Sequence, residues 1–178
     1  MQVFDTSSMI YAWDYYPISQ FPGLWEWMAS QVENKNLVMP NIAVQEVTKN
    51  SPECSKWLID NHLELLDMSN SIIAEAFRIK KLLGIVDDQY HPKGVGENDL
   101  FIIATAKIYS AELVTDEACQ YDLPANFAKR KIPTVCNMQE VSVNWINFID
   151  FIKRSKAHDY PQLALNVDNS QFFLKSLL

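Results

Sequence analysis

Three short apolar runs constrain the fold of this 178-residue chain more than any other feature. They cover residues 2–4, 37–39 and 113–115, each too short for a helix and each ending at a polar residue or a proline. Between them, apolar residues recur at helical spacing, most clearly over residues 97–110. Short strands that alternate with helices are typical of an α/β fold, so we expect a mostly parallel central sheet.

The rest of the pattern predicts the remaining elements. Helices are expected over residues 7–13, 24–33, 41–47, 51–59, 71–83 and 142–156, a loop over 87–96, and an edge strand over 132–135. Residues 63–66 fit either a strand or a continuation of the preceding helix. We expect a single domain over residues 1–178, with its core over about 1–136 and a C-terminal helical extension over about 140–178.

Charge and cysteine content narrow the classes of function. The net charge of −7 argues against a protein that holds nucleic acid by overall positive charge. It does not exclude a nuclease, because bound divalent cations invert the local charge of an acidic site. The three cysteines are scattered, with no CxxC pair, which indicates reduced thiols. With no secretory signal and no apolar run of about 18–20 residues, we expect a soluble cytoplasmic protein that does not enter a membrane.

Acidic residues follow two of the predicted strands. Asp5 comes directly after the first apolar run, and Asp116 and Glu117 come directly after residues 113–115. Taken singly, each could merely cap a helix or form a turn. Ligands of parallel α/β sheets, however, bind outside the carboxyl ends of the strands. These acids are therefore expected at the same edge of the sheet.

Two further acids border apolar helix faces. Asp99 shares one face of its predicted helix with Ile102 and Ile103, and Glu46 lies four residues after Ile42. An acid that stabilises the helix dipole is the simpler interpretation of Asp99, and a surface position is the simpler interpretation of Glu46. A carboxylate directed inward usually has a partner, because unpaired buried charge is costly.

Together the acids make a stronger case than they do separately. No lysine or arginine lies beside any of them in the sequence. Like charges brought close together cannot all stay ionised without compensation. Hard divalent cations, which prefer carboxylate oxygens, supply it and suit phosphoryl chemistry. The pattern therefore favours a metal-dependent nuclease.

Four segments resemble the PIN domain, in that family's order and across residues 1–136. They are Asp5-Thr6-Ser7-Ser8 after the first strand, Val44-Gln45-Glu46-Val47, residues 97–106 around Asp99, and Leu113-Val114-Thr115-Asp116-Glu117. The segment around Asp99 is the most specific. The sequence is most similar to bacterial toxins of the VapC type and their PIN-like relatives.

The resemblance implies a three-layer α/β/α sandwich and an Mg²⁺- or Mn²⁺-dependent ribonuclease that hydrolyses RNA. It implies metal binding by Asp5, Glu46 and Asp99, support from Ser7, and a fourth acid that is either Asp116 or Glu117. Family members usually carry that acid two residues after the strand-end threonine, which is the place of Glu117. The resemblance further implies an antitoxin protein as partner, and it leaves a homodimer open.

Other interpretations stay open on the sequence alone. A receiver-like phosphoryl-transfer domain also gathers acids and Mg²⁺ at strand ends, and Lys131 partly matches its lysine, but Asp5 lacks the adjacent second acid. A catalytically silent interaction module is the other alternative. The aromatic residues of the first third favour a bulky core over base stacking or partner binding. The basic runs at 129–131 and 153–156 favour solvated surfaces over contacts with RNA phosphates.

Overall fold

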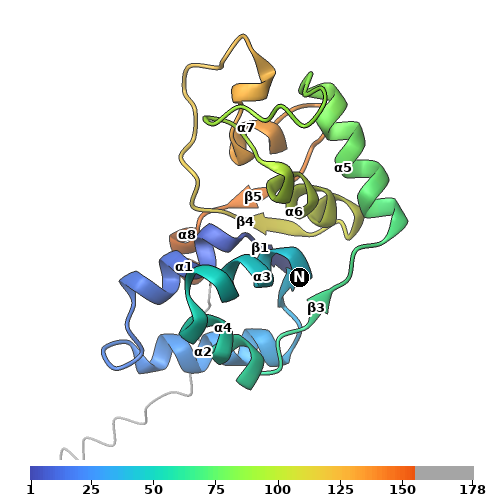
Figure 1. Cartoon of the computed structure of the whole chain (residues 1–178). Helices are drawn as coiled ribbons and strands as arrows, with labels where there is room; N and C mark the ends of the chain where they lie inside the picture. The colour runs from blue at the N-terminus through green and yellow to red at the C-terminus, as the bar shows by residue number, and fades with distance from the viewer. Residues whose placement is uncertain (155–178) are drawn as a thin grey trace, which may run out of the picture.

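The computed structural model describes residues 1–154, which fold around a five-stranded sheet whose paired strands are all parallel (Figure 1). The strand order is β3-β2-β1-β4-β5. The strands are β1 (Gln2–Phe4), β2 (Leu37–Pro40), β3 (Leu65–Leu66), β4 (Glu112–Val114) and β5 (Trp145–Ile146). The expected α/β class and parallel sheet are confirmed, and residues 65–66 form a strand.

The central strands are apolar because helices cover both faces of the sheet. Val3 pairs with Val38 on one side and with Leu113 on the other, and all three side chains are fully buried. Strands buried on both faces have near-continuous hydrophobic runs instead of alternating ones. This explains why such short segments could be recognised in the sequence.

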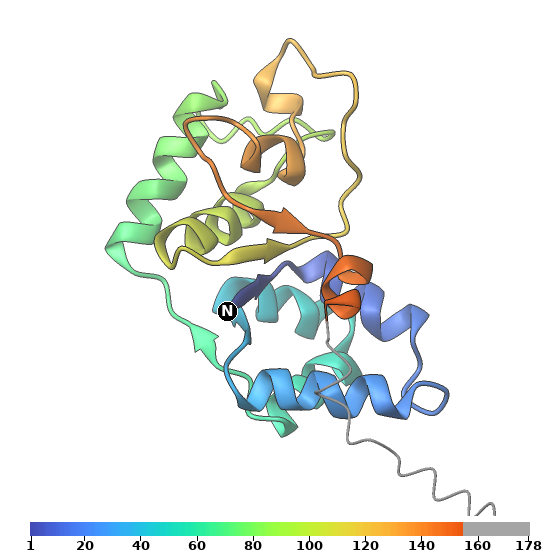
Figure 2. The same ribbon diagram turned by 180° about the vertical axis from the view of Figure 1, so that it is seen from behind.

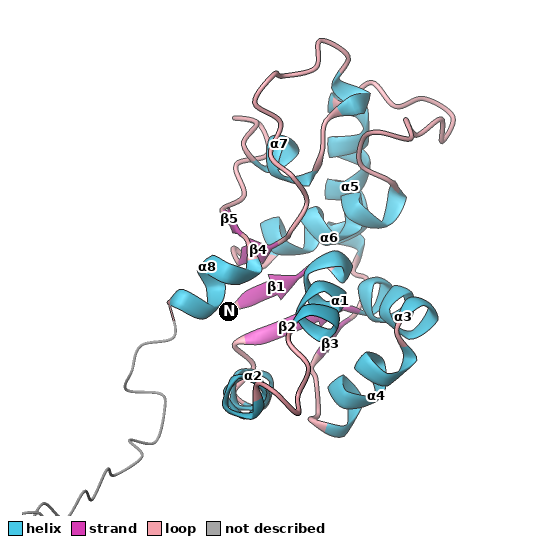
Figure 3. Cartoon of the chain, turned by 90° about the vertical axis from the view of Figure 1, so that its left-hand side faces the viewer, coloured by secondary structure: helices cyan, strands magenta, loops and turns pink. Residues whose placement is uncertain are grey.

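The helices form the two outer layers of a three-layer sandwich (Figures 2 and 3). One side carries α1 (Thr6–Tyr15), α2 (Pro22–Glu33), α3 (Asn41–Asn50) and α4 (Pro52–Asp60), and the other carries α5 (Asn70–Leu82), α6 (Glu97–Ile108) and α7 (Ile132–Cys136). A short 3-10 helix, η1 (Phe127–Lys129), precedes α7, and α8 (Phe148–Lys153) follows β5. None of the helices within residues 1–154 is long and apolar enough to cross a membrane.

Two expectations from the sequence are wrong. Residues 132–135 form the helix α7 and not an edge strand, because Pro133 occupies the first turn, where a missing N–H costs nothing. Residues 142–156 do not form one helix. They contain β5, which pairs with Leu113 and Val114, and then the short helix α8. Residues 155–178 of the expected C-terminal extension lie outside the described residues.

Aromatic side chains join α8 to the sheet and to α2. The Phe151 ring lies 5.0 Å from the ring of Phe4 and 5.0 Å from that of Trp27, measured between centroids. Phe148 is fully buried beside Tyr16. Among the predicted aromatic residues, Trp25 and Trp27 are buried and Tyr11, Trp13 and Tyr16 pack against the core, as the sequence favoured, whereas Tyr15 and Phe21 are exposed.

Candidate active site

The ends of two neighbouring strands bring Asp5 and Thr115 together. The Asp5 N–H donates to the Val114 carbonyl at 3.0 Å, which continues the β1–β4 ladder by one residue. The Thr115 hydroxyl then donates to Asp5 Oδ2 at 3.1 Å, and the Ser7 hydroxyl donates to the same oxygen. Asp5 is only 3% exposed. One oxygen of a buried carboxylate is thus fixed by two neutral hydroxyl groups.

Glu46 connects the beginnings of two helices. It lies on α3, where its Oε2 accepts a hydrogen bond of 2.8 Å from the Thr6 hydroxyl at the start of α1. Its Oε1 accepts one of 2.6 Å from the Asn98 side-chain amide in the first turn of α6. Both donors are neutral, so they orient the carboxylate without cancelling its charge.

Asp99 lies in the first turn of α6. Its Oδ2 accepts a hydrogen bond of 2.7 Å from the Gly96 N–H, one of the backbone groups that a helix leaves unpaired at its N-terminus. Asp99 therefore caps α6 and lies where it stabilises the helix dipole, which was the simpler interpretation of the sequence. It uses only one of the two carboxylate oxygens, so the other remains available for chemistry.

Four of the five predicted acids act on one another electrostatically. Burial, together with the negative charges of Asp99 and Glu117, raises the pKa of Asp5 from 3.8 to about 7, although the hydroxyl groups lower it. Burial, together with Glu117 and Glu46, likewise raises the pKa of Asp99. We call Asp5, Glu46, Asp99 and Glu117 the acid cluster.

Asp116 does not share in this interaction. Both of its oxygens lie 3.3 Å from the Phe148 N–H at the start of α8, and burial, not another carboxylate, raises its pKa. Glu117 turns the other way: its Oε2 accepts from the Ile132 N–H at 2.7 Å, and its Oε1 lies 3.6 Å from Lys131 Nζ. Adjacent residues of an extended segment point in opposite directions, and the structure thereby separates the two candidates for the fourth acid.

The acid cluster fits a divalent cation by the chemistry of its donors. Within residues 1–154, neither Asp5 Oδ1 nor Asp99 Oδ1 accepts a hydrogen bond. Mg²⁺ and Mn²⁺ prefer such oxygens. No group of three or more His, Cys, Asp or Glu residues in this part of the chain has its donor atoms gathered for one ion. Mg²⁺ usually needs only one or two carboxylates, since waters and phosphates complete its shell.

The structure also weakens the receiver-like alternative. Residue 6, beside Asp5, is a threonine that donates to Glu46, and Lys131 precedes a helix rather than following a last strand. Sequence reasoning assigned no role to Thr6, Asn98 or Thr115, the residues that orient the acids. In the sequence, only their position directly beside an acid of the PIN-like segments could have indicated this role.

Comparison with known proteins agrees with this architecture. A family model described as a domain of unknown function, DUF4411, matches residues 2–158. The chain belongs to the DUF4411 family. A comparison with curated proteins gave no match for it.

Solved structures similar to this DUF4411 chain include components of three complexes. A chain of VapBC2 from Rickettsia felis, solved with a DNA fragment from its promoter, is 20% identical with a TM-score of 0.50; the match covers 83% of the DUF4411 chain and 98% of the other. A chain of VapBC-1 from nontypeable Haemophilus influenzae is 18% identical with a TM-score of 0.49, and the match covers 82% of the DUF4411 chain and 96% of the other. A chain of FitAB bound to an IR36 DNA fragment is 16% identical with a TM-score of 0.48, and the match covers 83% of the DUF4411 chain and 94% of the other. The match to the VapBC2 chain, together with the parallel sheet, confirms the PIN-like three-layer fold that the sequence predicted.

Proposed function

We propose that this DUF4411 protein is an Mg²⁺- or Mn²⁺-dependent endoribonuclease that hydrolyses RNA phosphodiester bonds. The observation that carries the proposal is the environment of Asp5, a buried carboxylate beside Asp99 and Glu117 whose pKa burial and those charges raise to about 7. Within residues 1–154, only Lys131 forms an ion pair with a member of the cluster. A divalent cation would relieve this repulsion.

Asp5 and Asp99 are the residues that would hold the cation, because each has one oxygen that accepts no hydrogen bond from residues 1–154. When bound, such an ion lowers the pKa of water and stabilises negative charge on phosphate oxygens. Glu46 would complete the metal-binding triad through the remaining lone pairs of its oxygens, which accept hydrogen bonds from Thr6 and Asn98, and it keeps the first turn of α6 in place through Asn98.

The remaining groups position the reaction partners. The Ser7 and Thr115 hydroxyl groups fix the orientation of Asp5. Glu117 is the fourth acid in this proposal and holds a second cation or orients the attacking water. Lys131, already paired with Glu117 at the rim of the cluster, is placed to contact an RNA phosphate.

We further propose that the protein is a single domain that acts as the toxin of a toxin–antitoxin pair in the cytoplasm. Its fold resembles a chain of VapBC2 from Rickettsia felis. The end of α1 and the following loop expose apolar side chains suited to a protein partner: Tyr15 is 67% exposed, Ile18 39% and Phe21 41%.

Cleavage of a fluorescent single-stranded RNA, with Mg²⁺ or Mn²⁺ and then with EDTA, tests the proposed activity. We expect Asp99→Asn and Glu117→Gln to slow cleavage about 100-fold or more, since even supporting residues of metal sites cost 10–100-fold. Asp116→Asn is the matched control, because its carboxylate faces α8, and it should cleave near the wild-type rate. If Asp99→Asn cleaves as fast as wild type, the proposal is wrong.

Thermal unfolding separates the enzyme from a silent interaction module. A ligand that binds only the folded state raises the melting temperature. Mg²⁺ or Mn²⁺ should therefore stabilise the wild-type protein and Asp116→Asn, but not Asp99→Asn. An unchanged melting temperature in wild type, together with uncleaved RNA, would favour the interaction module.

A further inference from the structure

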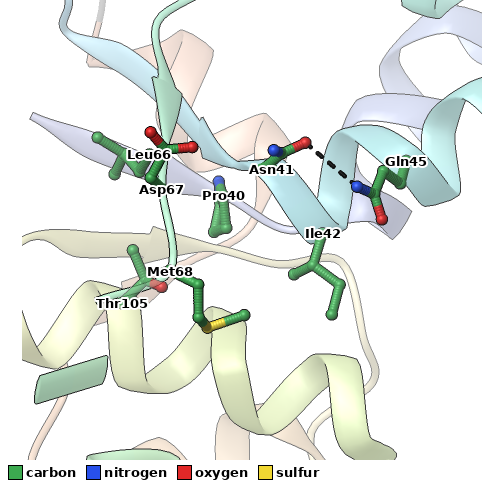
Figure 4. Close-up of a pocket in the computed structure, with 8 residues that line it drawn as sticks. All are labelled: Pro40, Asn41, Ile42, Gln45, Leu66, Asp67, Met68 and Thr105. Carbon is green, nitrogen blue, oxygen red and sulfur yellow. Dashed lines mark hydrogen bonds between the residues drawn. The ribbon is translucent and has the colours of Figure 1, made fainter. Parts of the chain in front are cut away.

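A pocket of about 410 Å³ opens at the carboxyl ends of β2 and β3 (Figure 4). Its walls include the last residue of each strand, Pro40 and Leu66, and the side of α6 at Thr105. This volume lies within the range of pockets that take small organic groups, about 300–1,000 Å³. None of its lining residues belongs to the acid cluster.

The pocket nevertheless lies beside the acid cluster, on the same edge of the sheet. Asp5 and Glu117 follow β1 and β4, and the pocket follows β2 and β3, which come next to β1 in the order β3-β2-β1-β4-β5. Glu46 connects the two, because it directly follows Gln45, which lines the pocket, and lies one helical turn beyond Ile42, which also lines it. Along α6, Thr105 is two turns from Asn98, the partner of Glu46, or about 10 Å at the usual rise.

The polar groups of the pocket have little else to bind. Asn41 and Gln45 on α3 meet in one hydrogen bond at 3.5 Å, the limit of such contacts, and no other side-chain hydrogen bond involves either within residues 1–154. The exposed Asp67 carboxylate has neither a hydrogen bond nor an ion pair in that part of the chain. Amides and carboxylates in such positions match the donor and acceptor edges of nucleic-acid bases.

The apolar walls favour a flat ring. Ile42 and Met68 extend toward α6 in Figure 4, and Met68 is 42% exposed although it is a large hydrophobic side chain. A methionine thioether packs well against an aromatic ring. A phosphate, in contrast, would meet apolar carbon on these walls and the negative charge of Asp67.

We propose that this pocket binds one unstacked base of the RNA substrate, next to the bond that is cut, and prefers a base with an exocyclic amino group. The inference rests on the proposed ribonuclease function. Asp67 accepts a hydrogen bond from the amino group of adenine, cytosine or guanine, and Asn41 and Gln45 bind the rest of the edge. Uracil has no amino group and is disfavoured. Sequence-specific RNA recognition commonly reads single-stranded bases in this way.

The test is cleavage of an RNA pool with a randomised central segment, in which the new ends are sequenced. The full-length wild type is compared with Asp67→Ala, which removes the acceptor oxygens, with Gln45→Ala as a second pocket variant and with Asp14→Ala as a matched control exposed on α1. Asp99→Asn supplies the background. Thermal melts confirm that each variant is folded, which we expect because Asp67 and Gln45 are both exposed.

We expect wild type and Asp14→Ala to disfavour uracil at one position beside the cut by about fivefold or more, the lower range for a good base contact. Asp67→Ala and Gln45→Ala should flatten that preference. If wild type cleaves without base preference, or both pocket variants keep it, the pocket inference is overturned while the ribonuclease function stands. If wild type cleaves no faster than Asp99→Asn, the ribonuclease function itself fails, and the inference with it.

Discussion

Replacing Asp5 with asparagine tests how much the buried negative charge of Asp5 destabilises the folded protein. The change keeps the size of the side chain and removes its charge. The amide oxygen of asparagine still accepts the hydrogen bonds that the Ser7 and Thr115 hydroxyl groups donate to Asp5. Any gain in stability therefore reports mainly the cost of the buried negative charge.

The magnitude follows from the pKa of Asp5. Burial, with the charges of Asp99 and Glu117, raises this pKa from 3.8 to about 7. The folded protein thus holds the proton more tightly than the unfolded chain does. Below pH 3.8 the group is protonated in both states and costs nothing. As the pH rises from 3.8 through about 7, stability is lost, up to about 4 kcal/mol at 1.36 kcal/mol for each pKa unit.

The assay is urea unfolding of wild type and Asp5→Asn in EDTA at a series of pH values. The free energy of unfolding that Asp5→Asn gains over wild type should be small at pH 4.5 and reach several kcal/mol at pH 8.5. Mg²⁺ should then stabilise the wild type more than the variant. An Asp5→Asn protein that is no more stable than wild type at pH 8.5 would refute the electrostatic reasoning.

Two further predictions test the packing around the site. Gly94→Ala should destabilise the protein by about 2 kcal/mol or more in urea unfolding, because its Cβ would lie 2.0 Å from the Ala128 carbonyl oxygen. Gly23→Ala, with nothing within 4 Å, is the control and should unfold at the same urea concentration or a slightly higher one; equal losses in both variants would contradict this account. A thiol reagent at pH 8 should modify the exposed Cys119 quickly and the other two cysteines only in urea, since burial raises the pKa of Cys54 and of Cys136 to about 12. Rapid modification of all three in the native protein would be inconsistent with the described core.

The sequence alone predicted the centre of the fold. Residues 2–4, 37–39 and 113–115 became β1, β2 and β4 almost without change, because helices cover both faces of these strands and most of their residues are apolar and buried. The helix that carries Asp99 was equally clear, since its apolar positions form a continuous stripe that packs on the sheet.

The edge of the sheet could not be predicted in the same way. β5 has only two residues, Trp145 and Ile146, and a segment this short has no periodicity to read. It is a strand because Leu113 and Val114 of β4 offer it backbone partners. Residues 132–135 have a strand-like composition, yet they form the helix α7, which has Pro133 in its first turn and lies in the crossover from β4 to β5.

The sequence alone also could not predict how the individual acidic side chains are directed. The order of the acids indicated which helices and strands would meet, but it could not decide between Asp116 and Glu117. That choice depends on two backbone N–H groups, those of Phe148 and Ile132, which follow the acids by 32 and 15 residues. Only the folded chain brings these donors to opposite sides of the segment.

Within residues 1–154, every side-chain hydrogen bond to Asp5 and Glu46 comes from a neutral donor, and most come from far along the chain. Thr115 is 110 residues from Asp5, and Asn98 is 52 residues from Glu46. A lysine at either place would have offset the negative charge of the carboxylate. Hydroxyl and amide groups instead hold the carboxylates in position and leave their repulsion in place. A protein that keeps such a cost in its core has usually retained it for function, and the cation that would relieve the repulsion is the one that the proposed hydrolysis requires.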